Sequence, residues 1–257
     1  QAHSARLHAR GRRFSGIVTI FRDITAEKEA DKMKTDLVSM VAHELQSPLT
    51  SIHGFSDLLL ESDLPEKKRK EYSGIILAES DRLTKLINRF LDLSRLEVGR
   101  TRVEMNSFDM GEVIKKVADL HADLAGRKKI KVITEIPPDL PLAWGDQELL
   151  EQVVINLYAN AVKYSPEDSK IGIEIKDNDD SLLTSVIDNG IGIPESSLPR
   201  IFDKFFRVSD GIDEKEVEGV GLGLALVKEI VDQHGGQIEV NSKLGVGSIF
   251  SFTIPKE

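Results

Sequence analysis

Cysteine is absent from the 257 residues of this sequence. Its absence excludes a disulfide scaffold, a thiolate metal site and a cysteine nucleophile. Long apolar runs are missing as well: none approaches the roughly 18 residues that a membrane-spanning helix needs, and no signal-peptide pattern opens the chain. We therefore expect a cytoplasmic chain. Because it begins with Gln1, we expect it to be part of a longer protein, in which any membrane anchor lies outside this sequence.

Basic residues are outnumbered: 34 Lys and Arg stand against 43 Asp and Glu, which gives a net charge of −9 at pH 7. This acidic balance argues against a general nucleic-acid-binding protein. Hydrophobic residues make up 40% of the chain, which is enough for buried cores in one large domain or two ordinary ones.

Residues 1–26 contain one strand-like run. It begins at Gly16, is rich in β-branched residues, and ends at a helix cap, either Asp23 or Thr25. A single strand cannot bury its own faces, so we expect its partner strands upstream of residue 1. Residues 1–26 are therefore interpreted as the C-terminal remnant of a preceding domain.

Residues 27–100 have the pattern of two long helices joined by a turn at Asp63–Glu66. Each helix carries one stripe of mainly apolar residues at spacings of three and four, interrupted only by Glu44. The stripes are Met33, Leu37, Met40, Pro48, Ile52, Phe55 and Leu59, and Tyr72, Ile76, Leu83, Leu86, Phe90 and Leu93. Such a hairpin forms only half a core, so we predict a homodimer with a coiled-coil-like four-helix bundle. The alternative is a monomeric hairpin packed on the rest of the chain.

Residues 101–257 mix strand and helix patterns without strict βαβ alternation. The predicted strands are Lys129–Ile136, Lys170–Lys176, Leu182–Ile187, Gln237–Asn241 and Ser248–Ile254, and the predicted helices are Asp109–Ala125, Asp146–Tyr164 and Gly221–His234. This mixture predicts an α+β sandwich, in which helices cover one sheet. The chain as a whole is thus predicted to be multidomain, with an all-α hairpin followed by an α+β domain.

Three glycine clusters lie in this last region, and none of them is a P-loop. Asp188 ends an apolar strand and precedes Gly190 and Gly192, so its carboxylate would face a pocket with little side-chain bulk, where it can accept a hydrogen bond from the amine of adenine. Gly219–Leu224 opens a helix, whose first amides favour phosphate. Alone, each cluster, including Gly245–Ser248, is more often a set of turns.

Asn156 and Asn160 lie four residues apart on one face of a predicted helix, with Lys163 one turn further along. Asparagine is a poor helix former, so two of them in an apolar helix call for a reason. Amide oxygens are suitable magnesium ligands, and lysine suits phosphate. The alternative is a polar helix edge that hydrogen-bonds to a loop.

His43 lies roughly a third of a turn from the centre of the first apolar stripe, at about 100° per residue, and is predicted to point outward. Ser47 lies one turn along on nearly the same face. An exposed histidine on a helix is most often only solvated, so this position alone does not establish a function. His234, before Gly235 and Gly236, is interpreted as a favourable charge at a helix C-terminus.

Together and in this order, these segments resemble the motifs of the sensor histidine kinase family. His43–Leu49 resembles its phosphoacceptor box and Asn156–Ser165 its asparagine box, while the other boxes of its ATP domain are resembled by Asp188–Ile193, Phe202–Arg207, Gly219–Leu224 and Gly245–Ser248. The resemblance implies a dimerisation and histidine-phosphotransfer hairpin over residues 27–100 and a GHKL-type ATP-binding domain over residues 101–257. The run from Gly16 to Thr25 is similar to the closing strand of a PAS sensor domain.

The resemblance implies a site for ATP and Mg²⁺. Asp188 would hold adenine, and Asn160 together with Asn156 would hold the magnesium ion. The remaining nucleotide-binding positions that it implies are Lys163, Tyr164, Gly190, Gly192, Ile193, Lys204, Phe205, Arg207, Gly219, Gly221, Leu222, Gly223, Leu224 and Ser248. The segment Val208–Gly219 would be a mobile lid.

The implied catalytic residues are His43, Glu44 and Ser47. His43 would attack the γ-phosphorus of ATP as a neutral imidazole, which is plentiful at pH 7 for a pKa near ~6.5. Glu44 would orient the ring. The phosphoryl group would then pass to an aspartate of a response regulator receiver domain docked on the hairpin. Ser47, where the family usually has Thr or Asn, and Gln46, where it usually has a basic residue, imply a weakened or altered phosphatase activity towards the regulator.

Two other classes remain as alternatives. The first is an ATPase clamp of the gyrase type, in which a glutamate base precedes the magnesium asparagine by four residues; here that position is Asn156. The second is a binding module that dimerises and docks partners without catalysis. Asn156 at the position of the base argues against activated water, and all the catalytic residue types of a kinase are present, so both alternatives rank below the kinase.

Overall fold

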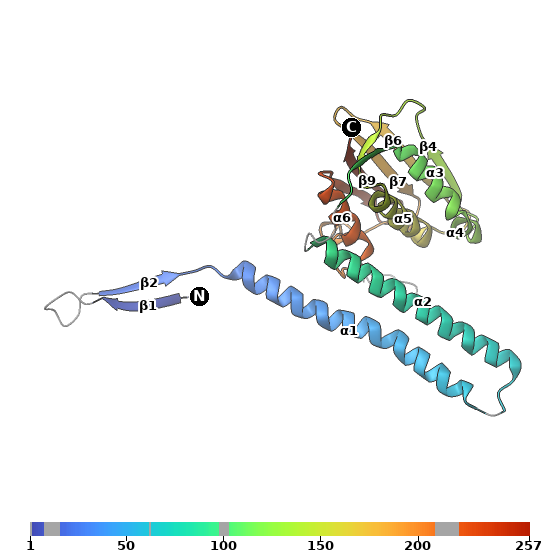
Figure 1. Ribbon diagram of the computed structural model, residues 1–257, viewed down its shortest axis with the longest axis horizontal. Helices are drawn as coiled ribbons and strands as arrows, with labels where there is room; N and C mark the ends of the chain where they lie inside the picture. Colours follow the sequence, from blue (N-terminus) through green and yellow to red (C-terminus); the bar gives the residue numbers. More distant parts are fainter. Residues whose placement is uncertain (1, 8–15, 62, 98–102, 209–220) are drawn as a thin grey trace. The chain divides into compact units, whose positions relative to one another are not determined.

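The computed structural model describes residues 2–7, 16–61, 63–97, 103–208 and 221–257 (Figure 1). Within these ranges the side chains of residues 2, 5–7, 16–18, 25–40, 43, 89, 95 and 97 are not described. The chain divides into two compact units, Gln1–Ser80 and Asp81–Glu257.

The first unit begins with an antiparallel hairpin of β1 (Ala2–Leu7) and β2 (Gly16–Phe21). Ser4 and Thr19 lie opposite each other, and their hydroxyl oxygens are 2.9 Å apart. The expectation that β2 pairs only with strands upstream of residue 1 is therefore wrong. The sequence of β1 lacks apolar alternation, so only its pairing with β2 identifies it as a strand. Phe21 of β2 remains 80% exposed, as expected when two strands cannot cover their own faces.

Two long helices follow, α1 (Thr25–Leu59) and α2 (Glu66–Glu97), and the first half of α2 belongs to the first unit. The rings of Phe55 and Tyr72 lie 5.3 Å apart, so the two helices contact each other through the predicted apolar stripes. Among the helices that the described residues form, none combines the length and hydropathy that a membrane crossing requires.

In both helices, the described residues of the predicted stripe include side chains that are less exposed than apolar residues outside it. In α2, Leu86 and Leu93 are 5% and 3% exposed, whereas Leu77, outside the stripe, is 64% exposed. In α1, Pro48 is buried, whereas Leu49 is 52% exposed. A helix whose apolar residues recur at this period buries one side only, which confirms the predicted helical pattern.

The second unit contains the α/β part of the chain. Its main sheet has the order β4-β6-β7-β9-β8, in which only β4 and β6 pair in parallel. The strands are β4 (Lys131–Glu135), β6 (Lys170–Asp177), β7 (Ser181–Asp188), β8 (Ile238–Lys243) and β9 (Gly247–Pro255); a small sheet pairs β3 (Asn106–Phe108) with β5 (Ala143–Gly145). The helices are α3 (Met110–Leu120), α4 (Ala122–Arg127), α5 (Gln147–Tyr164) and α6 (Gly223–Gln233), with a 3₁₀ turn at Leu198–Arg200.

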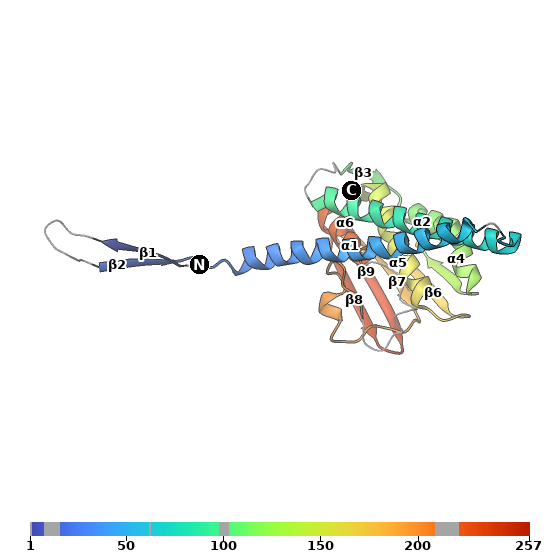
Figure 2. The ribbon, with the colours of Figure 1, turned by 90° about the horizontal axis from the view of Figure 1, so that it is seen from below.

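Helices α3, α5 and α6 pack on one face of the main sheet, as Figures 1 and 2 show. Alternate residues of each strand point to that face, because successive side chains of a strand point to opposite sides. In β6 the buried residues are Ile171, Ile173 and Ile175, each at most 1% exposed. This arrangement confirms the predicted α+β sandwich, and together with the helical pair it confirms the predicted multidomain fold.

The elements differ from the predicted ones mainly at their ends. The helix predicted over Asp109–Ala125 is two helices, separated at His121, and the helix predicted from Gly221 begins at Gly223. Strands β3 and β5 were not predicted, because three residues are too few to show a period of two.

His234 at the end of α6 differs from its predicted role. It is 3% exposed, its Nδ1 lies 2.7 Å from the carbonyl oxygen of Ile230, and its Nε2 accepts from the amide of Asp146 at 2.9 Å. Since Nε2 accepts a hydrogen bond, Nδ1 carries the proton and the ring is neutral. The interpretation as a favourable charge is therefore wrong. The ring instead joins the end of α6 to the start of α5.

Candidate functional site

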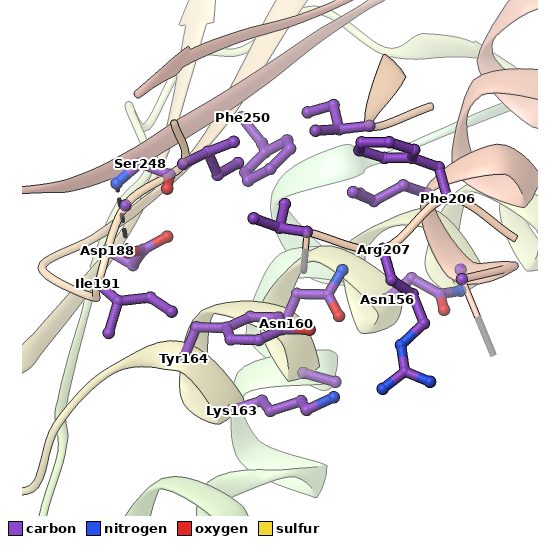
Figure 3. Close-up of a pocket in the computed structure, with 18 of the residues that line it drawn as sticks. Asn156, Asn160, Lys163, Tyr164, Asp188, Ile191, Phe206, Arg207, Ser248 and Phe250 are labelled. Atoms are coloured by element: carbon purple, nitrogen blue, oxygen red, sulfur yellow. Dashed lines mark hydrogen bonds between the residues drawn. The ribbon is translucent and has the colours of Figure 1, made fainter. Parts of the chain in front are cut away.

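A cavity of about 250 Å³ lies in the second unit, between α5, the end of β7 and the start of α6 (Figure 3). Its lining includes most of the predicted nucleotide-binding residues, namely Asn156, Asn160, Lys163, Tyr164, Asp188, Gly192, Ile193, Arg207, Gly221, Leu222, Gly223, Leu224 and Ser248. It also includes Val208, the first residue of the predicted lid, and five residues that were not predicted to bind nucleotide: Ala159, Ile191, Ile201, Phe206 and Phe250. Segments up to 94 residues apart in the sequence, from Asn156 to Phe250, thus meet in one cavity.

Asp188 reaches the cavity because it is the last residue of β7 on the helix-covered face. It shares that face with Leu182, Thr184 and Val186, all at most 1% exposed, and is itself 7% exposed. Burial raises the pKa of the Asp188 carboxyl, and hydrogen bonds from the amides of Gly190 and Ser248 oppose that rise.

The two carboxylate oxygens of Asp188 have different surroundings. Oδ1 accepts from the amide of Gly190 at 2.8 Å and from that of Ser248 at 3.3 Å. Oδ2 has no hydrogen-bond donor among the described residues. Oδ2 is not one of the fully buried side-chain atoms without a partner, so it is open to the cavity, where a ligand can donate to it. The site therefore offers an acceptor for an N–H group.

The loop after β7 is tightly packed, and this explains its glycines. Gly192 has φ +69°, and a Cβ there would contact the carbonyl oxygen of Lys243. A Cβ at Gly190 would lie 2.6 Å from the carbonyl oxygen of Tyr164. Only glycine fits such positions, so the loop is fixed against both α5 and the β8–β9 turn. Gly190 does not line the cavity and acts through its bond to Asp188.

Ser242 connects the loop after β7 to the start of β9, at the end of the cavity where Asp188 lies. No pattern in the sequence pointed to this residue. Its Oγ accepts from the amide of Ile193 at 2.9 Å and lies 2.9 Å from the Oγ of Ser248 and from the carbonyl oxygen of Gly247. The contact follows from the register of β8 and β9, which places Ser242 directly opposite Ser248.

Helix α5 supplies the polar wall of the cavity. Asn156, Asn160 and Lys163 share one helix face, as their spacing predicts, and all three line the cavity; Figure 3 shows Asn160 and Lys163 in the lower middle of the view and Asn156 to their right, beside Arg207. The amide nitrogen of Asn156 donates to the carbonyl oxygen of Gln152 at 2.8 Å, while its Oδ1 would lie 3.2 Å from a Cβ at Gly223. The oxygen of Asn156 thus faces the start of α6.

Arg207 lies across the cavity from Asp188, and Asn160 lies between them (Figure 3). Burial raises the pKa of Tyr164, and the nearby positive charge of Arg207 opposes that rise. The neighbouring Phe206 also lines the cavity, and the guanidinium of Arg200 lies 4.5 Å from its ring centroid. One end of the cavity is therefore acidic and the other is cationic.

Several predicted site residues lie elsewhere. Lys204 and Phe205 do not line the cavity. Phe205 is 7% exposed with φ +62°, and its amide donates to the carbonyl oxygen of Gly221 at 2.9 Å, so it supports the backbone beneath the start of α6. Burial lowers the pKa of Lys204, and Glu229 opposes that shift. Gly219 and the predicted lid, apart from Val208, lie outside the described residues.

The predicted catalytic residues lie in α1, in the first unit. Glu44 is half-buried and Ser47 is exposed. The backbone of His43 is helical, whereas its side chain lies outside the described part of the structure.

The residues around the cavity fit a nucleotide with magnesium. The unpartnered oxygen of Asp188 suits a base amine, while Lys163 and Arg207 suit an anion. The amide oxygens of Asn156 and Asn160 are hard ligands of the kind that magnesium prefers when phosphate oxygens and water complete its shell.

Comparisons with known proteins agree with this architecture. The family model described as "Histidine kinase-, DNA gyrase B-, and HSP90-like ATPase" matches residues 145–257, and the "His Kinase A (phospho-acceptor) domain" matches residues 33–99. The sensor protein KdpD of Clostridium acetobutylicum is 36% identical over 90% of this chain and 26% of its own length.

Two solved structures are similar over most of the chain. Histidine kinase ThkA in complex with response regulator protein TrrA has a TM-score of 0.71 at 27% identity, covering 100% of this chain and 75% of that one. Full-length ShkA in complex with AMPPNP has a TM-score of 0.66 at 27% identity, covering 86% of this chain and 46% of that one.

These matches join an ATPase-type domain to a phosphoacceptor-type helical pair within one chain. The chain belongs to the sensor histidine kinase family. It spans about a quarter to two fifths of the length of curated relatives such as KdpD.

Proposed function

We propose that this chain binds ATP with Mg²⁺ in the cavity and transfers the γ-phosphoryl group to His43, as a protein-histidine kinase. One observation carries the proposal: the buried carboxylate of Asp188, with one oxygen lacking a donor, lies across the cavity from Arg207. An adenine amine and a triphosphate fit these two ends. The AMPPNP bound to ShkA supports the same class of ligand.

The binding roles follow from the chemistry of the lining. The adenine amine donates to Oδ2 of Asp188, and Ile191 and Phe250 offer apolar contacts to the ring. Lys163, Arg207 and the first amides of α6 bind the phosphates. Asn160, together with Asn156, holds Mg²⁺, which when bound offsets negative charge on the phosphates.

His43 acts as the nucleophile. A ring nitrogen of the neutral imidazole forms a bond to the γ-phosphorus while the bond from that phosphorus to the bridging oxygen breaks, and ADP leaves with the electron pair. Glu44 hydrogen-bonds the other ring nitrogen and stabilises the positive charge that develops on the ring. In a second step the N–P bond breaks, as a carboxylate oxygen of an aspartate takes the phosphoryl group.

That aspartate belongs to a response regulator receiver domain in our proposal. The complex of ThkA with TrrA and the phosphoacceptor match over residues 33–99 support this partner. We assign residues 27–100 to phosphotransfer and homodimerisation as a four-helix bundle, residues 101–257 to ATP binding, and residues 1–26 to a PAS-like sensor remnant. Ser47 retains a hydroxyl that can orient water, so we expect a weakened phosphatase activity towards the regulator.

Incubation with γ-labelled ATP and Mg²⁺ tests the kinase. We expect label on the protein that is labile in acid and stable in alkali, and its absence in His43→Gln. His53→Gln is the matched control, because His53 is an exposed histidine of the same helix that pairs with Asp57 at 3.1 Å. Release of free phosphate from an unlabelled protein would indicate an ATPase clamp instead, and neither label nor nucleotide binding would indicate a binding module.

A further inference from the structure

The C-terminus of α5 has an unusual set of hydrogen-bond partners. The last carbonyls of a helix lack partners within it and need donors from elsewhere. Here the oxygen of Ala161 accepts from the amide of Ser165 at 3.1 Å, and that of Tyr164 accepts from the amide of Ile191 at 3.2 Å. The remaining carbonyl oxygens of this end all accept from the side chain of one residue, Lys128.

The Nζ of Lys128 donates to the carbonyl oxygens of Val162, Lys163 and Ser165 at 3.0, 2.8 and 3.0 Å. An ammonium group has three N–H donors, so each finds an acceptor, and among the described residues Lys128 has no acidic partner. A cation at this position also interacts favourably with the negative end of the helix dipole.

The backbone of Lys128 is fixed as well. Lys128 is the C-cap of α4, and its amide donates to the carbonyl oxygen of Ala125 at 3.1 Å. Its own carbonyl oxygen accepts from the amide of Asp168 at 3.0 Å. The residue therefore holds the segment that follows α5 from both its backbone and its side chain.

The end of α5 that Lys128 holds carries two side chains of the cavity wall, Lys163 and Tyr164. The same end anchors the loop after β7, because the carbonyl oxygen of Tyr164 accepts from Ile191 and lies against Gly190. Gly190 in turn donates to Asp188. A shift of the α5 terminus would thus move both the side chains that line the cavity and the loop that orients its carboxylate.

We propose that Lys128 is a positioning residue of the nucleotide site, which sets the place of Lys163, Tyr164 and the loop after Asp188 by holding the C-terminus of α5. This inference rests on the proposed binding of ATP in the cavity. Lys128 itself does not line the cavity and so acts only through the residues that it holds.

The test is the dissociation constant of a non-hydrolysable ATP analogue with Mg²⁺, measured by calorimetry on the full chain. We expect Lys128→Met to weaken binding by about tenfold, because part of the stabilisation lost with its three hydrogen bonds to the end of α5 appears as a loss of binding free energy. Lys131→Met is the matched control, because it removes the same charge from an exposed residue three positions along, and should bind within about twofold of the wild type.

A second readout separates positioning from a general loss of structure. We expect Lys128→Met to raise the KM for ATP in autophosphorylation, while the rate at saturating ATP stays within about twofold, since Lys128 does not contact the reacting atoms. Lys128→Arg keeps a cation but replaces a compact ammonium by a planar fork, so it should restore part of the affinity.

Each outcome bears on the inference. Wild-type affinity in Lys128→Met would overturn it, as would an equal loss in Lys131→Met. If Lys128→Met does not fold, Lys128→Gln replaces it, because the Gln amide has only two N–H donors for the three carbonyl oxygens and no charge, and wild-type affinity there would overturn the inference. Failure of the wild-type chain to bind the analogue would instead overturn the proposed function.

Discussion

Ser242 and Ser248 face each other across β8 and β9, with their hydroxyl oxygens 2.9 Å apart. Ser248 also donates its amide to Asp188, and Ser242 receives the amide of Ile193. The hydroxyl of Ser242 therefore links the loop after β7 to β9, the strand whose Ser248 amide donates to the carboxylate of Asp188. Small serine side chains at these positions leave the cavity open, while their hydroxyls fix its wall.

Ser242→Ala should weaken nucleotide binding by about fivefold, because the amide of Ile193 loses its acceptor and Ser248 loses its partner. The measurement is calorimetric titration with an ATP analogue. Ser251→Ala is the matched control: it removes a hydroxyl pair with Ser185 at 2.8 Å in the same sheet, but neither residue lines the cavity. Equal affinity losses in both variants would show that sheet stability, rather than the loop, is responsible.

Asp188 should make nucleotide affinity depend on pH. Burial raises the pKa of its carboxyl, so the group takes up a proton at a pH above the ordinary aspartate range. Protonation removes the negative charge that accepts from the base amine, so affinity should fall as the pH falls through that raised pKa. Titrating an ATP analogue at a series of pH values measures the effect. Asp188→Asn should bind more weakly and lose this part of the pH dependence; an unchanged profile would contradict the role of Asp188.

The same raised pKa has the opposite effect on folding. A carboxyl whose pKa is higher in the folded than in the unfolded chain binds its proton more tightly in the folded chain. Its contribution to the free energy of unfolding therefore rises as the pH falls and is lowest above the raised pKa. Comparing denaturant midpoints of the wild type and Asp188→Asn across this pH range checks the sign. A wild type that loses more stability on acidification than Asp188→Asn would contradict it.

The sequence predicted the groups that touch the cavity better than the groups that hold them. Asp188 could be predicted because it lies between an apolar strand and two glycines. Asn160 could be predicted because it shares a helix face with a second asparagine, and both patterns are visible in the local sequence. Ser242 and Lys128 could not, since their roles depend on the register of β8 with β9 and on the meeting of two turns distant in sequence. Local patterns do not contain such tertiary contacts.

The fold shows the same division. Long periodic elements such as α5 were predicted closely, whereas β3 and β5 were too short and β1 lacked alternation. His234 was misassigned for a related reason: its place at a helix end suggested an exposed charge, but packing buries it against Gly145 and Asp146.

His234→Ala should lower the free energy of unfolding by about 2–4 kcal/mol, since it leaves the partly buried amide of Asp146 without an acceptor and opens a cavity where the buried ring was. Urea denaturation measures this loss. His121→Ala is the control, because His121 is only partly buried and bonds its own helix, at the carbonyl of Val117. Similar losses in both variants would argue against a special role for the buried ring.

Gly192 and Gly245 separate two effects of glycine next to the cavity. Both have positive φ, +69° and +79°, but a Cβ at Gly192 would contact the backbone of Lys243, whereas a Cβ at Gly245 would have no neighbour within 4 Å. Gly245→Ala should therefore lower the stability only by the strain of placing alanine in a left-handed conformation, about 1–2 kcal/mol. Nucleotide affinity should stay within about twofold of the wild type.

Gly192→Ala carries the same conformational cost and must also push the loop away from the β8–β9 turn, which displaces Ile193 and the surroundings of Asp188. We expect it to weaken binding of the ATP analogue by more than about tenfold, a loss of more than about 1.4 kcal/mol of binding free energy. Thermal denaturation of both variants establishes that they are folded. Equal losses of affinity in Gly192→Ala and Gly245→Ala would show that the effect comes from the left-handed backbone conformation that both positions share. They would contradict the claim that close packing of Gly192 against the β8–β9 turn holds the surroundings of Asp188 in the geometry that nucleotide binding requires.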